Sequence, residues 1–426
     1  MNRMILAKLE QSFLPILLKV GENKRLIAIR NGITLTIPFT IVGSIFLIIG
    51  NLPINAWTDF IEPISAQLNA PVSVTFGVLG LVSAIGIGYN MGKEFEVDPI
   101  SNTVITTIAF LLATLTDEFA INIDSLGATG MFTAIIVSLF TTEVFRFFVS
   151  KNIVIKMPDG VPPSVAQSFS SLIPAGAIIA TIWVIRVLMG VDVNEVIQFI
   201  FKPLVFGLST LPGLMVYTLL VCFLWSCGIH GDNVLSGIAS PIFLGYLAAN
   251  TLAFQKGQPI PYEIADGFWI LFMCLGGTGS TLGLVLAMLR SRSKMYRSLG
   301  KMALPSAIFC INEPVIFGFP IVMNPIMMIP FVATPMILGT ATFLLMKIGL
   351  VGKIVFQVPW TIPPIIGPYL ATNGSVGAAI WSACTIVIAY LIYLPFFKMA
   401  EKKQVLLEAG ESEQEAMAEI AQTVES

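Results

Sequence analysis

Ten stretches of mainly apolar residues, each about twenty residues long, constrain the fold of this chain more than any other feature. A helix needs about 20 apolar residues to cross the hydrocarbon layer of a membrane. The stretches lie at 31–51, 73–92, 99–116, 127–149, 164–190, 207–227, 234–254, 265–289, 321–347 and 374–397. Apolar residues make up 56% of the chain and charged residues only 11%, which is outside the range of soluble domains. The sequence therefore predicts an all-α polytopic membrane protein with about ten transmembrane helices.

The distribution of lysine and arginine predicts how these helices are oriented. Six basic residues precede the first stretch, whereas residues 52–72 contain none. Because cytoplasmic loops carry an excess of Lys and Arg, we expect both termini in the cytoplasm. Alternation places three acidic residues outside: Asp117, Glu118 and Asp124. It places two basic groups inside: Arg146, Lys151 and Lys156, and then Arg290, Arg292, Lys294, Arg297 and Lys301.

The chain divides into two membrane halves, 1–205 and 206–400, followed by a polar tail, 401–426. The tail favours a short polar helix or disorder. Two further segments, 52–70 and 191–206, are typical of amphipathic helices that lie at the membrane surface. The charged first thirty residues lead into a full-length apolar stretch, so we expect no cleaved signal peptide.

Neither the net charge nor the cysteines suggest another class of protein. The net charge of −2 gives no indication of nucleic-acid binding. Five cysteines lie singly inside apolar stretches without C-x-x-C spacing. The sequence therefore predicts neither a disulfide nor a metal site, and no cofactor.

Two apolar segments are interrupted by prolines, and interrupted backbone at membrane depth survives only where protein or a watery cavity covers it. The first, 303–325, reads ALPSAIFCINEPVIFGFPIVMNP and contains Asn312 and Glu313 directly before Pro314. A carboxylate inside an apolar stretch is costly, so Glu313 is a candidate functional residue. The alternative is a glutamate at a helix end among lipid headgroups. The second segment, 358–375, reads VPWTIPPIIGPYLATNGS and cannot form a straight helix.

The only histidine of the chain, His230, lies in the stretch GIHGDNV, at the end of an apolar run. Its flanking glycines permit a turn and close backbone approach. Asp232 and Asn233 could orient or hydrogen-bond a ligand. The alternative is a loop histidine without a role, but its place beside a membrane span that ends near Trp225 favours function.

Three tryptophans lie near these interruptions: Trp225, Trp360 and Trp381. Aromatic faces pack against the apolar face of a sugar ring, while the ring hydroxyls need polar partners such as Asn312, Glu313 and His230. The pattern therefore favours a carbohydrate site. Taken singly, each tryptophan is more typical of the aromatic belt at a membrane interface, and only their convergence would make a site.

The glycine-rich stretch LGGTGSTLG, 275–283, is not a phosphate-binding loop because it lacks the G-K-[ST] ending. Small residues there predict close helix packing. Thr278 and Ser280 could also offer hydroxyls to a polar ligand.

Together, GIHGDNV, INEPVIFGFPIVMNP, VPWTIPP and the N-terminal LAKLEQSFLPILLKVGENKRLIAIRNGI resemble the enzyme IIC component of the lactose/cellobiose branch of the bacterial phosphotransferase system. The diacetylchitobiose/cellobiose transporters are the most similar, and the resemblance covers residues 1 to about 400. It implies a homodimer in the bacterial cell membrane. The N-terminal half would form the dimer interface, and two re-entrant hairpins of the C-terminal half would hold a β-linked disaccharide.

The resemblance also implies roles for individual residues. Glu313 and His230 would contact the sugar hydroxyl that receives phosphate from a phosphocysteine on the IIB subunit. We expect IIB to be a separate protein, since no cysteine follows Cys384. We favour Glu313 as the general base and His230 as the orienting group, because a carboxylate near apolar surface binds a proton more readily.

A proton- or ion-coupled secondary sugar transporter is the main alternative, because it also uses intramembrane carboxylates and broken helices. The chemical form of the delivered sugar separates the two functions. Free sugar would indicate coupled transport, and sugar phosphate would indicate the phosphotransferase system.

Overall fold

The computed structural model describes residues 22–51, 55–158, 160–319, 321–322 and 324–410, and these residues form helices and no β-strand. An isolated bridge between Leu115 and Ile121 is the one strand-like pairing found among them. The prediction of an all-α chain is therefore confirmed. The N-terminal residues 1–21 and the tail residues 411–426 lie outside the described residues.

The chain forms two compact units. Unit 1 contains Met1–Leu208 and Asp232–Leu252, and unit 2 contains Ser209–Gly231 and Ala253–Ser426. The helices up to the first boundary are α2 (Lys24–Thr34), α3 (Ile37–Gly50), α4 (Asn55–Ile61), η1 (Glu62–Ile64), α5 (Ser65–Gly77), α6 (Leu79–Glu94), α7 (Pro99–Ala113), α8 (Ile123–Leu126), η2 (Ala128–Gly130), α9 (Met131–Ser150), α10 (Pro163–Ser170), α11 (Leu172–Trp183), η3 (Val184–Leu188) and α12 (Val193–Leu208).

The helices that follow are α13 (Leu211–Ser226), α14 (Gly231–Gln255), η4 (Trp269–Met273), α15 (Leu282–Leu289), α16 (Lys294–Ile308), α17 (Glu313–Gly318), α18 (Pro325–Lys347), α19 (Ile366–Ala371) and α20 (Val376–Glu408). Most of α14 belongs to unit 1, although both of its ends belong to unit 2. The dimerisation and sugar-binding roles of the two sequence halves stay predictions.

Within the described part of the chain, six helices are long and apolar enough to cross a membrane: Lys24–Gly50, Ala128–Ser150, Val165–Leu188, Gly231–Gln255, Ile326–Lys347 and Val376–Glu408. Two bent pairs raise this number to as many as eight: Gln67–Gly77 with Leu79–Glu94, bent by 42°, and Val193–Leu208 with Leu211–Ser226, bent by 83°. Pro99–Ala113 is apolar but shorter. The chain therefore has the helices of a multi-pass membrane protein, and the count of ten stays a prediction.

The prediction that residues 265–289 form one continuous helix is wrong. Residues 265–289 form the short π-helix η4, a tight turn and then α15. The turn contains Gly276, Gly277 and Gly279 with φ angles of +82°, +100° and +86°. A right-handed helix cannot continue through three such positions, so the apolar run is divided in the middle.

The predicted surface segments are helical where they are described. The segment 52–70 contains α4, η1 and the first part of α5, with residues 52–54 outside the described part. The segment 191–206 is largely α12. Their position at a membrane surface stays a prediction. The polar tail begins as a continuation of α20, which ends at Glu408.

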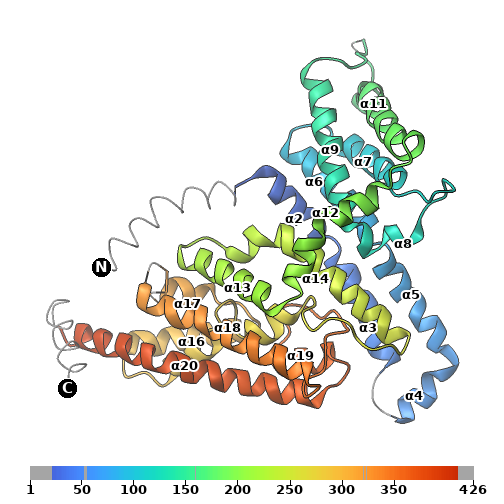
Figure 1. Cartoon of the computed structure of the whole chain (residues 1–426). Helices are drawn as coiled ribbons and strands as arrows, with labels where there is room; N and C mark the ends of the chain where they lie inside the picture. The colour runs from blue at the N-terminus through green and yellow to red at the C-terminus, as the bar shows by residue number, and fades with distance from the viewer. Residues whose placement is uncertain (1–21, 52–54, 159, 320, 323, 411–426) are drawn as a thin grey trace. The chain divides into compact units, whose positions relative to one another are not determined.

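In unit 1, α6, α7, α9 and α11 pack against one another (Figure 1). Small residues allow α2 and α6 to approach each other closely. A Cβ on Gly32 would lie 2.4 Å from the backbone nitrogen of Ile87, and a Cβ on Gly86 would lie 2.4 Å from the carbonyl oxygen of Gly32. Either substitution would push the two helices apart.

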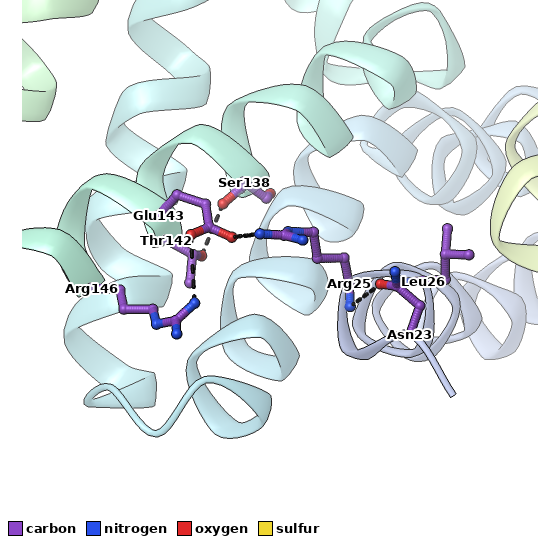
Figure 2. A network of polar contacts seen from close by, with 7 residues as sticks. All are labelled: Asn23, Arg25, Leu26, Ser138, Thr142, Glu143 and Arg146. Carbon is purple, nitrogen blue, oxygen red and sulfur yellow. Dashed lines mark hydrogen bonds and ion pairs between the residues drawn. The ribbon is translucent and has the colours of Figure 1, made fainter. Parts of the chain in front are cut away.

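One end of unit 1 is held by a charged cluster (Figure 2). Arg25 Nε at the start of α2 donates to Glu143 Oε1 of α9 at 2.9 Å, and Arg146 Nη1 lies 3.8 Å from Glu143 Oε2. Both guanidinium groups lie over the Phe95 ring, with Cζ 5.7 Å (Arg25) and 5.3 Å (Arg146) from its centroid. Cation–π attraction offsets part of the repulsion between two neighbouring cations. The cluster joins α2, α9 and the segment after α6.

In unit 2, α15 lies beside α16 and α20, and α18 lies beside both α13 and α20 (Figure 1). Gly283 permits the contact between α15 and α20, because a Cβ there would lie 2.4 Å from the backbone nitrogen of Tyr390. These helices surround the interrupted segments that contain most of the candidate site residues.

Candidate functional site

The candidate site residues are concentrated where helices of unit 2 stop. Three interruptions matter here: residues 227–230 after α13, the glycine-rich stretch 275–283, and residues 309–312 between α16 and α17. Left-handed backbone occurs in all three, for example at Gly228 (φ +80°), Gly277 (φ +100°) and Cys310 (φ +62°). The sequence prediction of a break is confirmed after α13 and between α16 and α17, whereas the break at 275–283 was not predicted.

Trp225 and His230 lie against each other. Their ring centroids are 4.2 Å apart, with a tilt of 43° between the planes. Trp225 is buried and only 4% exposed, whereas His230 is partly buried. The fixed indole therefore restricts the orientation of the imidazole. Gly231 makes this geometry possible, because a Cβ there would lie 2.3 Å from the carbonyl oxygen of Val221.

The turn that contains His230 also meets the segment that follows α17. A Cβ built on Gly228 would lie 3.5 Å from Val322 Cγ1, an ordinary contact distance. The two sequence segments that carry most of the resemblance are thus neighbours in space, although 94 residues separate these two positions (322 minus 228).

Glu313 is exposed and is the first residue of α17, with Pro314 next to it. The helix breaks before Glu313 and restarts with it, as the proline predicted. An exposed carboxylate at a helix N-terminus is favoured by the helix dipole and stays available to a ligand.

Asn312 is nearly fully buried, at 3% exposed, and joins two interruptions. Its Nδ2 donates to the carbonyl oxygen of Thr278 at 2.7 Å and to Thr281 Oγ1 at 3.2 Å. A Cβ on Gly277 would lie 2.3 Å from Asn312 Cγ, so only glycine admits the amide there. The glycine-rich stretch therefore holds the residue next to Glu313, as well as permitting the close packing that the sequence predicted.

The two hydroxyl candidates in this stretch differ in what they contact. Ser280 is fully buried, and its Oγ donates to the carbonyl oxygen of Met273 at 2.6 Å. This contact stabilises the turn itself. Thr278 is 7% exposed and its carbonyl accepts from Asn312. Two further residues support the turn and were not singled out from the sequence: Thr281, whose Oγ1 donates to Gly276, and Tyr393 of α20, whose hydroxyl donates to Gly279 at 2.8 Å.

Three candidates remain: Trp381, Trp360 and Asn233. Trp381 of α20 donates from Nε1 to Thr342 Oγ1 of α18 at 2.8 Å. Trp360 is 52% exposed in the irregular stretch before α19. Asn233 is exposed in the first turn of α14 and belongs to unit 1, where its carbonyl oxygen accepts from Arg30 at 3.4 Å. The convergence of the three tryptophans on one pocket stays a prediction.

No group of three or more His, Cys, Asp or Glu side chains placed to hold a metal ion occurs among the described residues. All five cysteines are free thiols.

Residues 30–335 match the family described as "Phosphotransferase system, EIIC". This chain belongs to that EIIC family. It is 40% identical to the lichenan permease IIC component of Bacillus subtilis (strain 168), over 93% of this chain and 94% of the relative. It is 38% identical to the cellobiose-specific EIIC component of Geobacillus stearothermophilus, over 95% of this chain and 96% of the relative.

A solved structure agrees with this assignment. The crystal structure of ChbC, the IIC component from the N,N'-diacetylchitobiose-specific phosphotransferase system, matches with a TM-score of 0.91 and 38% identity. The match covers 95% of this chain and 100% of ChbC. The predicted family and helical membrane fold are thus confirmed. The EIIC chain is a multi-pass membrane permease component of a sugar phosphotransferase system.

Proposed function

We propose that this EIIC chain transports a β-linked disaccharide, of the cellobiose or diacetylchitobiose type, and holds it while it is phosphorylated. Relatives named for lichenan, cellobiose and diacetylchitobiose support this substrate class. The single observation that carries the proposal is the near-complete match to ChbC. The family match also favours phosphotransfer over the ion-coupled alternative.

Glu313 and His230 are the proposed catalytic pair. The exposed Glu313 carboxylate would accept the proton of the sugar hydroxyl as its oxygen attacks phosphorus. The new O–P bond forms as the S–P bond of a phosphocysteine breaks, and the cysteine leaves as thiolate. His230, held against Trp225 at a ring distance of 4.2 Å, would orient the hydroxyl. Trp225, Trp360 and Trp381 are the proposed stacking surfaces for the sugar rings.

Four further polar residues are proposed to bind the remaining hydroxyls: Asn233, Thr278, Ser280 and Asn312. The contacts of Ser280 and Asn312 within the protein favour a supporting role for these two side chains. The phosphocysteine donor would lie on a separate IIB subunit that docks on the cytoplasmic side. A homodimer built through the N-terminal half completes the proposal.

The decisive substitution is Glu313→Gln, compared with Glu195→Gln as a matched control. Both glutamates are exposed and lie in the first turn of a helix. We expect Glu313→Gln to reduce sugar phosphorylation by phosphorylated IIB at least about 100-fold, the usual contribution of a general base. Glu195→Gln should retain it. Unchanged phosphorylation in Glu313→Gln would remove the residue from the mechanism.

The substrate class has its own test. Thermal stabilisation of the purified protein by a panel of mono- and disaccharides identifies the sugar, because a ligand that binds only the folded state raises its stability. Delivery of free sugar without phosphorylated IIB would support the ion-coupled alternative instead.

A further inference from the structure

A cavity of about 410 Å³ lies between α15 and α20 of unit 2, and its lining includes none of the residues of the proposed sugar site. Its lining is apolar apart from two residues, Arg290 and Tyr390. The apolar lining residues are Leu286, Leu289, Ile386, Val387 and Leu391. Val387 and Leu391 are 57% and 59% exposed, so the cavity opens along the surface of α20. In a membrane-spanning helix such a surface faces lipid or another protein.

Arg290 is the only charged residue that lines this cavity. It is exposed, and its Cζ lies 6.0 Å from the centroid of the Tyr390 ring. Among the residues that the structure describes, no carboxylate forms an ion pair with Arg290. The cation–π contact places the guanidinium without using its N–H donors. These donors therefore remain available to an anion at the mouth of the cavity.

The carboxylates nearest in sequence to this region of α20 are occupied by other partners. Glu401 accepts from Ser291 Oγ and from the backbone nitrogen of Arg292, both at 2.7 Å, and pairs with Lys398 at 2.6 Å. The two residues that follow Arg290 are thus fixed to α20. Because the neighbouring backbone is already fixed, a ligand that binds Arg290 causes little further loss of conformational entropy in the protein.

The surroundings of Arg290 are positively charged. Four exposed basic residues follow it in the next eleven positions: Arg292, Lys294, Arg297 and Lys301. Basic clusters at the end of membrane helices attract anionic lipids, and basic pockets between such helices bind phosphate headgroups. An apolar cavity that ends in a guanidinium, with no carboxylate partner among the described residues, matches an acyl chain joined to a phosphodiester. The charge favours a lipid with net negative charge over a zwitterionic one.

We propose that this cavity binds an anionic phospholipid. One acyl chain lies along Leu286, Leu289 and Val387, and the phosphate oxygens accept hydrogen bonds from Arg290. The site is independent of the sugar site and of the catalytic pair, so it stands whether or not the proposed substrate is correct.

The headgroup contact is tested with Arg290→Gln and the matched control Arg292→Gln. Arg292 carries the same charge two positions away and does not line the cavity. The full-length protein in a sugar-free detergent is titrated with phosphatidylglycerol or with phosphatidylcholine of the same acyl chains, and its thermal unfolding is followed. We expect phosphatidylglycerol to stabilise the unmodified protein more than phosphatidylcholine. Arg290→Gln should raise the concentration of phosphatidylglycerol needed for half-maximal stabilisation about tenfold or more. Arg292→Gln should leave this concentration largely unchanged.

The acyl contact is tested with Val387→Trp, which fills the cavity, and with Ile380→Trp as its control. Ile380 is 61% exposed on the same helix but does not line the cavity. We expect only Val387→Trp to abolish the selective stabilisation while Arg290 is still present. Glycerol phosphate without acyl chains should give no comparable shift. The same elution volume in size-exclusion chromatography verifies that each variant is folded.

Four outcomes would overturn the proposal. Equal stabilisation of the unmodified protein by both lipids would show that there is no anionic site. Equal losses in Arg290→Gln and Arg292→Gln would show diffuse attraction to basic residues only. A full shift with glycerol phosphate would assign the site to a soluble anion. A change in oligomeric state caused by Val387→Trp alone would assign the cavity to a second copy of the chain.

Discussion

Asn312 and Glu313 are adjacent in the sequence, yet the structure gives them opposite surroundings. The Asn312 side chain is buried and donates to the glycine-rich stretch at Thr278 and Thr281, whereas the Glu313 side chain is exposed. One peptide unit separates a fixed amide from a free carboxylate. The position of the proposed general base is therefore determined by its neighbour, and a small movement of Asn312 would displace Glu313 from a bound hydroxyl.

We expect Asn312→Ala to lower both stability and sugar phosphorylation. The substitution leaves the buried carbonyl oxygen of Thr278 without its donor, which costs about 1–3 kcal/mol of unfolding free energy. Asp98→Ala is the control for stability alone. It removes an N-cap of α7, where Asp98 accepts from the backbone nitrogen of Ser101 at 2.8 Å, and costs about 1 kcal/mol. Thermal unfolding and phosphorylation rates are measured for both. If Asn312→Ala and Asp98→Ala had the same stability and the same phosphorylation rate, Asn312 would have no role in positioning Glu313.

The last turns of α20 hold the segment that begins α16. Glu401 accepts from Ser291 and Arg292, and Glu408 accepts from the backbone nitrogens of Lys294 at 2.9 Å and Met295 at 3.1 Å. Burial, with the Glu408 carboxylate adding to it, raises the pKa of Tyr296 to about 12. A polar extension of one apolar helix thus supplies the N-terminal caps of another.

Glu401→Ala should destabilise the protein more than Glu408→Ala. Glu401 is only 4% exposed, and its loss leaves the buried Ser291 hydroxyl unsatisfied, at a cost of about 1–3 kcal/mol. Glu408 is exposed, so water replaces its carboxylate after the substitution. Unfolding of both variants by heat or denaturant in detergent measures the difference. A larger loss of stability in Glu408→Ala would mean that the capping of α16 by Glu408 contributes more than the buried contact between Glu401 and Ser291.

The sequence was sufficient to predict which segments are apolar and where prolines break them, because both depend on residue type alone. The broken segment around Glu313 was predicted in this way, and the turn after α13 was predicted from the glycines that flank His230. The division of 265–289 was not, since glycines in an apolar run favour close packing as much as they favour a turn. The contacts of Asn312 with Thr278 and of Tyr393 with Gly279 connect positions 34 and 114 residues apart. No local pattern specifies such pairs, so the supporting residues of the site required the structure.

The ion pairs of the molecule test the predicted topology, because two residues that form an ion pair must lie on the same side of the membrane. Arg25 and Arg146, both predicted inside, share Glu143. Asp117, predicted outside, pairs at 2.9 Å with Arg186, whose side chain is 3% exposed and also donates to the carbonyl of Leu115. The alternation of helices places Arg186 outside as well, although it is basic and therefore an exception to the charge bias. Residues that the alternation assigns to one side thus lie together within unit 1. This agreement supports the predicted alternation of the helices, and leaves the choice of the cytoplasmic side to experiment.

Cysteine labelling in intact cells would decide that choice. Glu118, in the acidic loop, and Ser150, at the end of α9, are both exposed and lie on opposite sides of the predicted topology. Cys384 is the one exposed native cysteine, so Cys384→Ser serves as the background. We expect a membrane-impermeant thiol reagent to label Glu118→Cys from outside, because the loop that contains it has no Lys or Arg, and Ser150→Cys only after permeabilisation. Reversed labelling would invert the orientation of every helix, and labelling of both positions from outside would show that α9 does not span the membrane.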